Sequence, residues 1–426
     1  MTTGLDAHTF VLPDELSATR PAEARGLARD QVRMMVSDAG VLTHARFREL
    51  PSFLRAGDLV VVNNSAMLSA AVDARYADEA AVLHFSTWLD DGRWVVELRD
   101  PAGIPWRGRA VKPGARLDLP DDNLAILVEP WLPGTDRLWV AAIVAGHRRV
   151  RSAPTTGDES ATAATKARRA AVETSGGTAA RDGHRERRPT RHPDMSLAGT
   201  SSAGMDSGRQ HAGMTGRVGG REVSAAVDVR GLLARYGRPI AYSYLSERWS
   251  ASYYRTVFGI EPGSAEMPSA GRSFTAELVT ELVAGGVGLA PITLHTGVSS
   301  PEAGEPPSPE RFAVPEMTAR LVNATHAAGG RVVAVGTTVT RALESAVDAQ
   351  GLVRAAGGWT DLVLDGSRPA RAVDGLITGW HAPGASHLHL LEAVAGARVV
   401  GEAYRAALES GYLWHEFGDT ALLFRD

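Results

Sequence analysis

The stretch from Arg151 to Arg221 divides the chain and limits where its hydrophobic core can lie. It is rich in Gly, Ala, Ser, Thr and Arg, contains few large apolar residues and has no Phe, Trp or Tyr. Such a composition cannot bury enough apolar surface to offset the conformational entropy that is lost on ordering. We therefore predict a disordered insertion over residues 151–221, with folded protein on both sides of it.

This predicted insertion is also basic. It contains twelve Lys/Arg and seven Asp/Glu, a net charge of +5, whereas the whole chain has a formal charge of −4, so the remainder carries −9. A basic segment beside an acidic body could contact a polyanion, but a short basic stretch is more often a solvated linker. Both interpretations remain open.

Short strand-like runs alternate with turn residues before the insertion. They are rich in β-branched and aromatic residues and recur about every ten residues, which is typical of a small β-barrel or sandwich. The runs are AAVLHFSTW, GRWVVELRD, PGARLDL, LAILVEP and DRLWVAAIV. We assign residues 69–150 to this small β domain, and residues 1–68, which include the strand-like run GDLVVVNN, to the main domain.

Strands and helices alternate after the insertion. Helical spacing is found in FTAELVTELVAGG, PEMTARLVNATHAAGG, TRALESAVDA, SHLHLLEAVAG and GEAYRAALESG. Strand-like runs are VGLAPITLH, RVVAVGTT, TDLVL, DGLIT and TALLF. This alternation predicts that residues 222–426 form most of a layered α/β domain.

Composition narrows the class of protein further. Hydrophobic residues make up 44% and charged residues 22% of the chain, which is ordinary for a globular protein. No apolar run is long enough to span a membrane, and the first residues do not resemble a secretion signal. The absence of cysteine excludes disulfides and thiolate chemistry. We expect a cytoplasmic protein without membrane contact, and a monomer is favoured.

Polar residues at predicted strand ends are candidates for a ligand site. In RVVAVGTTVTRALES, Thr337 and Thr338 open a helix whose free amides could hold a carboxylate or phosphate, although N-capping alone would explain both threonines. In ITLHTG the strand ends on His295, where a structural histidine is the common alternative. Arg341 and Glu344 are three residues apart on the same helix and close enough to pair.

Seven segments resemble, in order, motifs of the S-adenosylmethionine:tRNA ribosyltransferase-isomerases of queuosine synthesis. They are FVLPDELSATRPAEAR, THARFRELPSFLRAGDLVVVNNS, YYRTVFGIEPGSAEMPSAGRSFT, ITLHTG, VAVGTTVTRALES, VDGLITGWHAPGAS and YLWHEFGDTALLF. The resemblance covers nearly the whole chain outside the insertion. It implies an α/β domain with an inserted β-barrel, S-adenosylmethionine and tRNA as substrates, and no metal.

The reaction that the resemblance implies moves the ribosyl part of S-adenosylmethionine to the aminomethyl group of a 7-deazaguanine in tRNA. The ribose is rearranged, so that epoxyqueuosine forms and adenine and methionine are released. A base must remove a proton from the carbon beside the sulfonium sulfur, and a donor must help adenine to leave; neutral histidine suits both roles. We expect His295 and His381 to be catalytic, with Asp374 as an orienting carboxylate.

Residues that match the family motifs are the expected substrate-binding set. They are Asn63, Asn64, Arg99, Gly271, Gly297, Thr337, Thr338, Arg341, Glu344 and Thr378. The methionine carboxylate of the donor is expected at the helix start formed by Thr337 and Thr338, with Arg341 nearby.

The chain also departs from the family motifs. Two family arginines are replaced by Ala66 and Ala71, a family histidine by Ser273 and a family asparagine by Gly379. Arginine is the usual side chain for bidentate binding of phosphate or carboxylate. The alternative interpretation is therefore a non-catalytic or repurposed protein of the same fold that binds S-adenosylmethionine or nucleic acid.

Three histidines lie close together in TGWHAPGASHLHLL. His381 falls on a histidine of the family, whereas His387 and His389 fall on apolar positions of the following helix. Helix positions two apart do not share a face, so His387 and His389 cannot both reach a metal bound by His381. We predict no metal site, one site histidine, and two helix residues that are either exposed or line an altered pocket.

Overall fold

The computed structural model describes residues 9–106, 108, 110–132, 137–146, 227–298 and 307–425. The predicted disordered insertion lies outside these residues. All of the described residues belong to one compact unit, which spans residues 1–147 and 224–426. None of the helices in the described ranges combines the length and the apolar character that crossing a bilayer requires.

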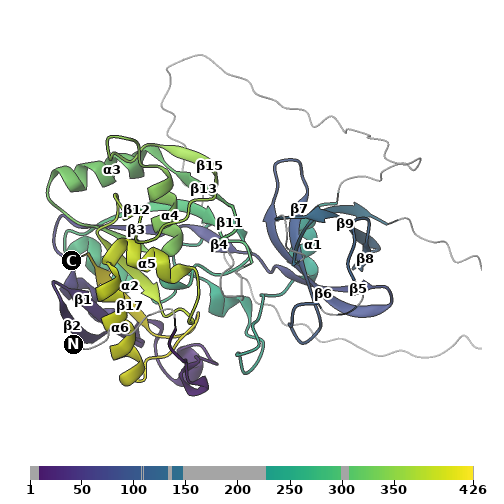
Figure 1. Ribbon diagram of the computed structural model, residues 1–426, viewed down its shortest axis with the longest axis horizontal. Coiled ribbons are helices and arrows are strands. Elements are labelled where there is room, and N and C mark those ends of the chain that lie inside the picture. The colour runs from purple at the N-terminus through teal and green to yellow at the C-terminus, as the bar shows by residue number, and fades with distance from the viewer. Residues whose placement is uncertain are drawn as a thin grey trace, which may run out of the picture. The chain divides into compact units, whose positions relative to one another are not determined.

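The main domain is built on a nine-stranded sheet with the order β15-β13-β12-β3-β14-β16-β17-β1-β2 (Figure 1). Its four central strands run parallel: β12 (Gly288–His295), β3 (Leu59–Asn63), β14 (Val332–Val335) and β16 (Gly375–Gly379). On one side, β17 (Thr420–Phe424) is antiparallel to β16, β1 (Arg33–Asp38) is parallel to β17, and β2 (Val41–Arg46) is antiparallel to β1. On the other side, β13 (Glu310–Val314) and β15 (Ala356–Thr360) are added in antiparallel fashion.

Helices cover both faces of this sheet, because its strands bury side chains on both sides. In β3, Leu59 and Val61 belong to one hydrophobic cluster, whereas Val60 and Val62 belong to another. The first cluster also contains residues of α3 (Glu316–Ala327), α4 (Thr337–Ser345), α5 (His387–Ala395) and α6 (Ala397–Glu409). The second contains residues of α2 (Ala276–Ala284) and of the 3-10 helix Phe47–Phe53. The predicted layered α/β domain is confirmed.

A closed six-stranded barrel is inserted after β3, in the strand order β10-β7-β6-β5-β8-β9. Its strands are β5 (Ala71–Tyr76), β6 (Glu79–Trp88), β7 (Trp94–Arg99), β8 (Arg116–Leu119), β9 (Asn123–Pro130) and β10 (Leu138–Ala145). The rings of Phe85 and Trp94 meet edge to face in its core, and α1 (Val229–Tyr236) packs Leu232 and Leu233 into the same cluster. The short parallel pair β4 (Ser65–Met67) and β11 (Glu261–Ser264) flanks the insertion point. The inserted barrel is thus confirmed, while the boundaries placed at residues 68 and 150 stay predictions.

Two features of the main sheet differ from the sequence-based expectation. The strand expected over TDLVL is wrong, since β15 ends at Thr360, where TDLVL begins. Beyond the strand end, the Leu362 carbonyl accepts a hydrogen bond from the buried Arg341 guanidinium, and Leu364 is buried in the core. The antiparallel pair β1–β2 was not anticipated either, because β2 is largely exposed and lacks the apolar alternation of a strand.

Candidate functional site

A cavity of about 400 Å³ lies where parallel strands of the main sheet end. The carboxyl ends of parallel strands meet at one edge of a sheet, and this edge is the common ligand site of open α/β folds. Residues directly after β14 and at the end of β16 line the cavity, together with Thr296, which follows β12. The volume is sufficient for a small organic ligand.

The cavity brings together four of the residues predicted from the sequence. Thr337 and Thr338 line it at the start of α4, and Thr378 and His381 line it at the end of β16. Gly336 connects β14 to α4 with φ +93°, a conformation that favours glycine, and this turn places the first amides of α4 at the cavity wall. A helix start in this position is suited to an anionic group.

His381 is held by its neighbours on several sides. The Thr378 hydroxyl donates to the carbonyl of Gly379 at 3.1 Å and lies 3.1 Å from His381 Nε2. The direction of the contact between Thr378 and His381 depends on the tautomer of the ring, and donation by Thr378 to Gly379 corresponds to a hydrogen on Nε2. The backbone of His381 is fixed as well, because its amide donates to Tyr404 Oη at 3.1 Å. Burial, with smaller effects of two neighbouring histidines, lowers the pKa of His381 well below its ordinary value, so the ring is neutral at pH 7.

His387 and His389 have different surroundings, as expected for helix positions that are two residues apart. His387 lines the cavity and stacks on His381, with ring centroids 4.6 Å apart and planes inclined by 6°; burial lowers its pKa to about 4. His389 is exposed, with Glu392 at 3.8 Å. Within the described ranges, no group of three or more His, Cys, Asp or Glu side chains is placed to hold a metal ion.

Three stacked rings form a wall of the cavity that sequence reasoning missed. Tyr242 and Tyr244 stack at 5.8 Å, and Tyr244 stacks on His415 at 4.1 Å. His415 has φ +71°, a left-handed conformation that is uncommon for a residue other than glycine and that tends to occur at functional sites. The only local signal in the sequence is the pair of tyrosines in the motif YSY, which lies in a turn closed by a hydrogen bond from the Leu245 amide to the Tyr242 carbonyl at 3.1 Å. A parallel stack of rings suits a planar, aromatic ligand.

Two carboxylates in the cavity were also missed. Glu266 accepts a hydrogen bond from the Tyr242 hydroxyl, and Glu416 accepts one from the Tyr244 hydroxyl. Burial raises the pKa of Glu416, and it raises the pKa of Tyr244 well above its ordinary value. The partners of each pair are far apart in the chain, so no local motif announces them.

Other predicted residues build the strand ends without lining the cavity. The Asn63 side-chain amide donates to the Leu294 carbonyl at 2.8 Å, and its oxygen accepts from the Leu294 amide at 3.1 Å, which joins β3 to β12. Asn64 accepts from the Thr293 hydroxyl at 2.7 Å. His295 Nδ1 lies 2.8 Å from Ser65 Oγ, and burial lowers the pKa of the ring. His295 therefore takes part in a hydrogen-bond network of hydroxyl groups, and the next residue, Thr296, lines the cavity.

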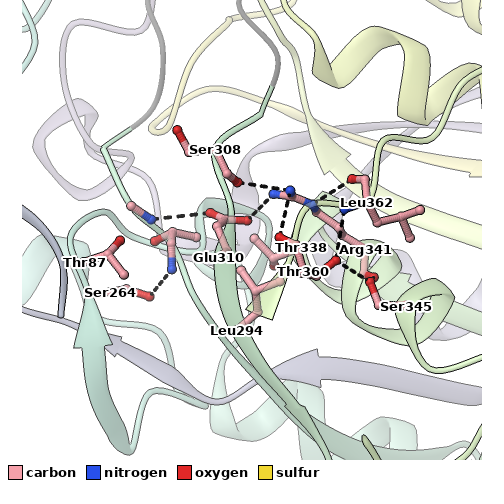
Figure 2. A network of polar contacts seen from close by, with 12 residues as sticks. Thr87, Ser264, Leu294, Ser308, Glu310, Thr338, Arg341, Ser345, Thr360 and Leu362 are labelled. Carbon is pink, nitrogen blue, oxygen red and sulfur yellow. Dashed lines mark hydrogen bonds and ion pairs between the residues drawn. The ribbon is translucent and has the colours of Figure 1, made fainter. Parts of the chain in front are cut away.

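The Arg341 guanidinium binds other groups of the protein and does not line the cavity (Figure 2). Its side chain is 6% exposed and forms an ion pair with Glu310 at 2.7 Å. Its remaining hydrogen bonds go to the carbonyls of Ser308, Thr360 and Leu362. The expected pairing of Arg341 with Glu344 is therefore wrong, because the guanidinium of Arg341 is already surrounded by these acceptors.

Glu344 has a structural environment of its own. Its carboxylate accepts hydrogen bonds from the amides of Arg371 and Ala372 at 2.8 and 2.7 Å. It therefore fastens the segment before β16 to α4, and it does not line the cavity.

Asp374 lies just before β16, at the opposite end of that strand from His381. It accepts from His326 Nε2 at 2.9 Å and from the Val332 amide at 2.9 Å. Although burial raises its pKa, these hydrogen bonds lower it below the ordinary value. The geometry gives no support to Asp374 as the orienting group of His295 or His381.

The last predicted residues lie in structural contacts. Arg99 is buried in the barrel and binds Glu97 with two hydrogen bonds of 2.7 and 2.9 Å. Gly271 packs near Phe258, and Gly297 approaches the barrel so closely that a Cβ would lie 2.7 Å from Ser86 Oγ. None of these three predicted residues lines the cavity.

The chain is thus an α/β protein with an inserted β-barrel and a cavity at the carboxyl ends of its parallel strands. The chain belongs to the family described as Queuosine biosynthesis protein, whose model matches residues 5–148 and 195–423. The predicted family membership is thereby confirmed.

Relatives of this chain are similar over nearly their whole length. The S-adenosylmethionine:tRNA ribosyltransferase-isomerase of Methylobacterium sp. (strain 4-46) is 29% identical, over 99% of this chain and 98% of its own. The protein of the same name from Gluconacetobacter diazotrophicus is 30% identical, over 98% of this chain and 95% of its own. A crystal structure of S-adenosylmethionine tRNA ribosyltransferase from Thermotoga maritima has 23% identity and a TM-score of 0.45, and the match covers 98% of this chain and 99% of that one.

Proposed function

We propose that this protein is an S-adenosylmethionine:tRNA ribosyltransferase-isomerase of queuosine biosynthesis. The observation that carries the proposal is its similarity to enzymes of that name over almost the full length of both chains. In the proposed reaction, the ribosyl part of S-adenosylmethionine is transferred to the aminomethyl group of a 7-deazaguanine in tRNA, and epoxyqueuosine, adenine and methionine are formed. The cavity at the strand ends would hold the donor.

His381 is the proposed base of this reaction. In the tautomer that carries its hydrogen on Nε2, Nδ1 can accept the proton removed from the carbon beside the sulfonium. Its lowered pKa keeps the ring unprotonated throughout the neutral range, and it also weakens the ring as a base. No metal is required for this proton transfer, so chelation with EDTA should leave turnover unchanged.

The start of α4 is the proposed site for the methionine carboxylate of the donor. The amides of Thr337 and Thr338 stand at the positive end of the helix dipole. Arg341, which was expected to assist, is already occupied by Glu310. The affinity for this carboxylate would therefore come from backbone amides and hydroxyls.

The test of the proposed function is adenine release from S-adenosylmethionine by the purified full chain, followed by chromatography. Release that depends on tRNA carrying the aminomethyl-deazaguanine is the expected result, and His381→Ala should abolish it. His389→Ala is the matched control, since His389 is exposed beside the same stretch and should retain turnover. If the unaltered protein binds S-adenosylmethionine but releases no adenine, the proposed reaction is wrong and a binding protein of the same fold replaces it.

A further inference from the structure

A second pocket, of about 210 Å³, lies beside the cavity at the strand ends. The chain segment 238–245 separates the two spaces. Tyr244 of this segment lines the cavity, Ala241 and Ser243 line the second pocket, and Tyr242 lines both. The cavity and the second pocket therefore share one wall.

Two arginines, Arg238 and Arg248, line the second pocket. The backbone of Arg238 is fixed, because its amide and carbonyl form two hydrogen bonds of 2.9 Å with Ala71 of β5. The Arg238 guanidinium is 24% exposed and pairs with Asp73, whose side chain is 78% exposed, so this ion pair is weak. The Arg248 guanidinium donates to the Pro101 carbonyl at 3.3 Å. An arginine has five N–H donors, so both guanidinium groups keep donors for a ligand.

The formal charge around the second pocket is positive among the described residues. Glu247 is the only acidic residue among those that line it. His84 also lines the second pocket, and its ring is neutral at pH 7 because burial lowers its pKa. His84 Nδ1 lies 3.4 Å from the buried Glu97, which forms ion pairs with Arg99 at 2.7 Å and Arg137 at 2.9 Å. Two arginines and one carboxylate give this adjoining group a formal charge of +1.

A pocket with these groups is suited to a phosphate. Guanidinium groups bind phosphate oxygens through charge-assisted hydrogen bonds, which are stronger than those between neutral groups. The chain outside residues 151–221 has a formal charge of −9, so the folded part of the protein needs a locally basic place to bind RNA. The second pocket supplies such a place next to the cavity.

The acceptor in the proposed reaction is a nucleotide of an RNA chain. Enzymes that act on a base take it out of its stack and into their own site, whereas the charged backbone stays outside. If the base reaches the donor in the cavity, a neighbouring phosphate has to be bound beside the cavity. A pocket that shares a wall with the cavity meets this requirement.

On this basis we propose that the second pocket binds a backbone phosphate of tRNA next to the acceptor nucleotide, through Arg238 and Arg248. This inference rests on the proposed function for the identity of the RNA. Contacts to phosphate fix the position of a nucleic acid and do not read its sequence. Arg238 and Arg248 are therefore positioning residues for the acceptor and are not expected to bind S-adenosylmethionine.

The test measures the Kd for tRNA that carries the aminomethyl-deazaguanine, by fluorescence anisotropy at several NaCl concentrations and without S-adenosylmethionine, so that no turnover occurs. Arg238→Gln and Arg248→Gln should each weaken tRNA binding roughly three- to tenfold at about 0.1 M salt. Each variant should also reduce the slope of log Kd against log salt concentration by about 0.7–0.9, because one phosphate contact is lost. The Kd for S-adenosylmethionine should stay within about twofold, which checks that the cavity is intact.

Two further variants test whether charge at this place is the cause. Arg320→Gln is the matched control, since Arg320 is 70% exposed on α3 and pairs with Glu316 of the same helix. It should leave both the Kd for tRNA and the salt slope unchanged. Glu247→Gln removes the acidic residue that lines the second pocket, and it should tighten tRNA binding.

An unchanged Kd and salt slope in both arginine variants would overturn the phosphate site. Weaker binding with an unchanged slope would also overturn it, since the loss of a phosphate contact changes the number of counterions released. A reduced slope in both variants, without adenine release by the unaltered protein, would support the phosphate site and refute the proposed function. Adenine release with unchanged slopes would do the reverse, and a failure of the unaltered protein to bind this tRNA would refute both.

Discussion

Replacing Arg341 with methionine should lower stability and leave ligand affinity unchanged, although the sequence places this arginine among the substrate-binding residues. The side chains of Arg341 and Glu310 are 6% and 16% exposed and 2.7 Å apart. Removing one partner of a buried ion pair costs about 3–5 kcal/mol, because the other charge remains buried. Glu310 keeps some exposure and a long hydrogen bond of 3.4 Å from the Gly297 amide. We therefore expect the lower end of that range, about 3 kcal/mol.

The stability lost in Arg341→Met should depend on pH. Burial raises the pKa of Glu310 above its ordinary value of 4.5, and the charge of Arg341 opposes that rise. Without Arg341, the folded-state pKa of Glu310 should rise further. The folded protein would then bind more protons than the unfolded chain, so stability falls as pH rises above 4.5. The variant should lose more stability at pH 8 than at pH 5.

The assay is urea denaturation followed by tryptophan fluorescence, with the free energy of unfolding extrapolated to water. The double variant Arg341→Met/Glu310→Gln should be more stable than Arg341→Met alone, because it leaves no unpaired buried charge. The Kd for S-adenosylmethionine should stay within about twofold in the folded variants. A variant of normal stability that no longer binds S-adenosylmethionine would refute this reasoning and return Arg341 to the binding site.

Three further predictions concern other residues of the candidate set. His381→Ala should lose turnover while its free energy of unfolding stays close to that of His389→Ala, as measured by adenine release and urea denaturation. Asp374→Asn should keep kcat and lose about 1 kcal/mol of stability, since its contacts are structural; a large loss of kcat at normal stability would contradict this. Arg99→Met should destabilise the barrel by about 3 kcal/mol without changing the Kd for S-adenosylmethionine. Although burial raises the pKa of Glu97, hydrogen bonds and arginine charges lower it to about 2. The stability that this carboxylate contributes is therefore present above pH 4.5 and is lost as the pH falls towards 2. This contribution should be smaller in Arg99→Met.

Local patterns in the sequence were sufficient for most of the secondary structure. The run LVVVN is apolar throughout, and it forms a strand buried on both faces. The helix over Glu316–Ala327 and the strand over Thr420–Phe424 likewise follow from apolar periodicity. The prediction for TDLVL was wrong because Leu362 and Leu364 pack against the core from an irregular segment while Val363 is exposed, and periodicity alone does not distinguish such a segment from a strand.

The candidate site was predicted only in part. Thr337, Thr338 and His381 belong to motifs at strand ends, and the topology of a parallel sheet brings such ends together. Arg341 belongs to the same motif as Thr337 and Thr338, yet its side chain binds Glu310, a residue 31 positions earlier in the chain. A motif identifies the type of a residue, whereas the direction of its side chain depends on what is packed beside it.

The sequence by itself determined the class of fold, the family and the strand ends at which a ligand site forms, because these depend on periodicity, composition and local motifs. Only the tertiary structure decided which polar groups share the cavity. Tyr244 and Glu416 are 172 residues apart in the chain, and Tyr242 and Glu266 come from different segments of irregular structure. Their proximity follows from the packing of the chain around the sheet.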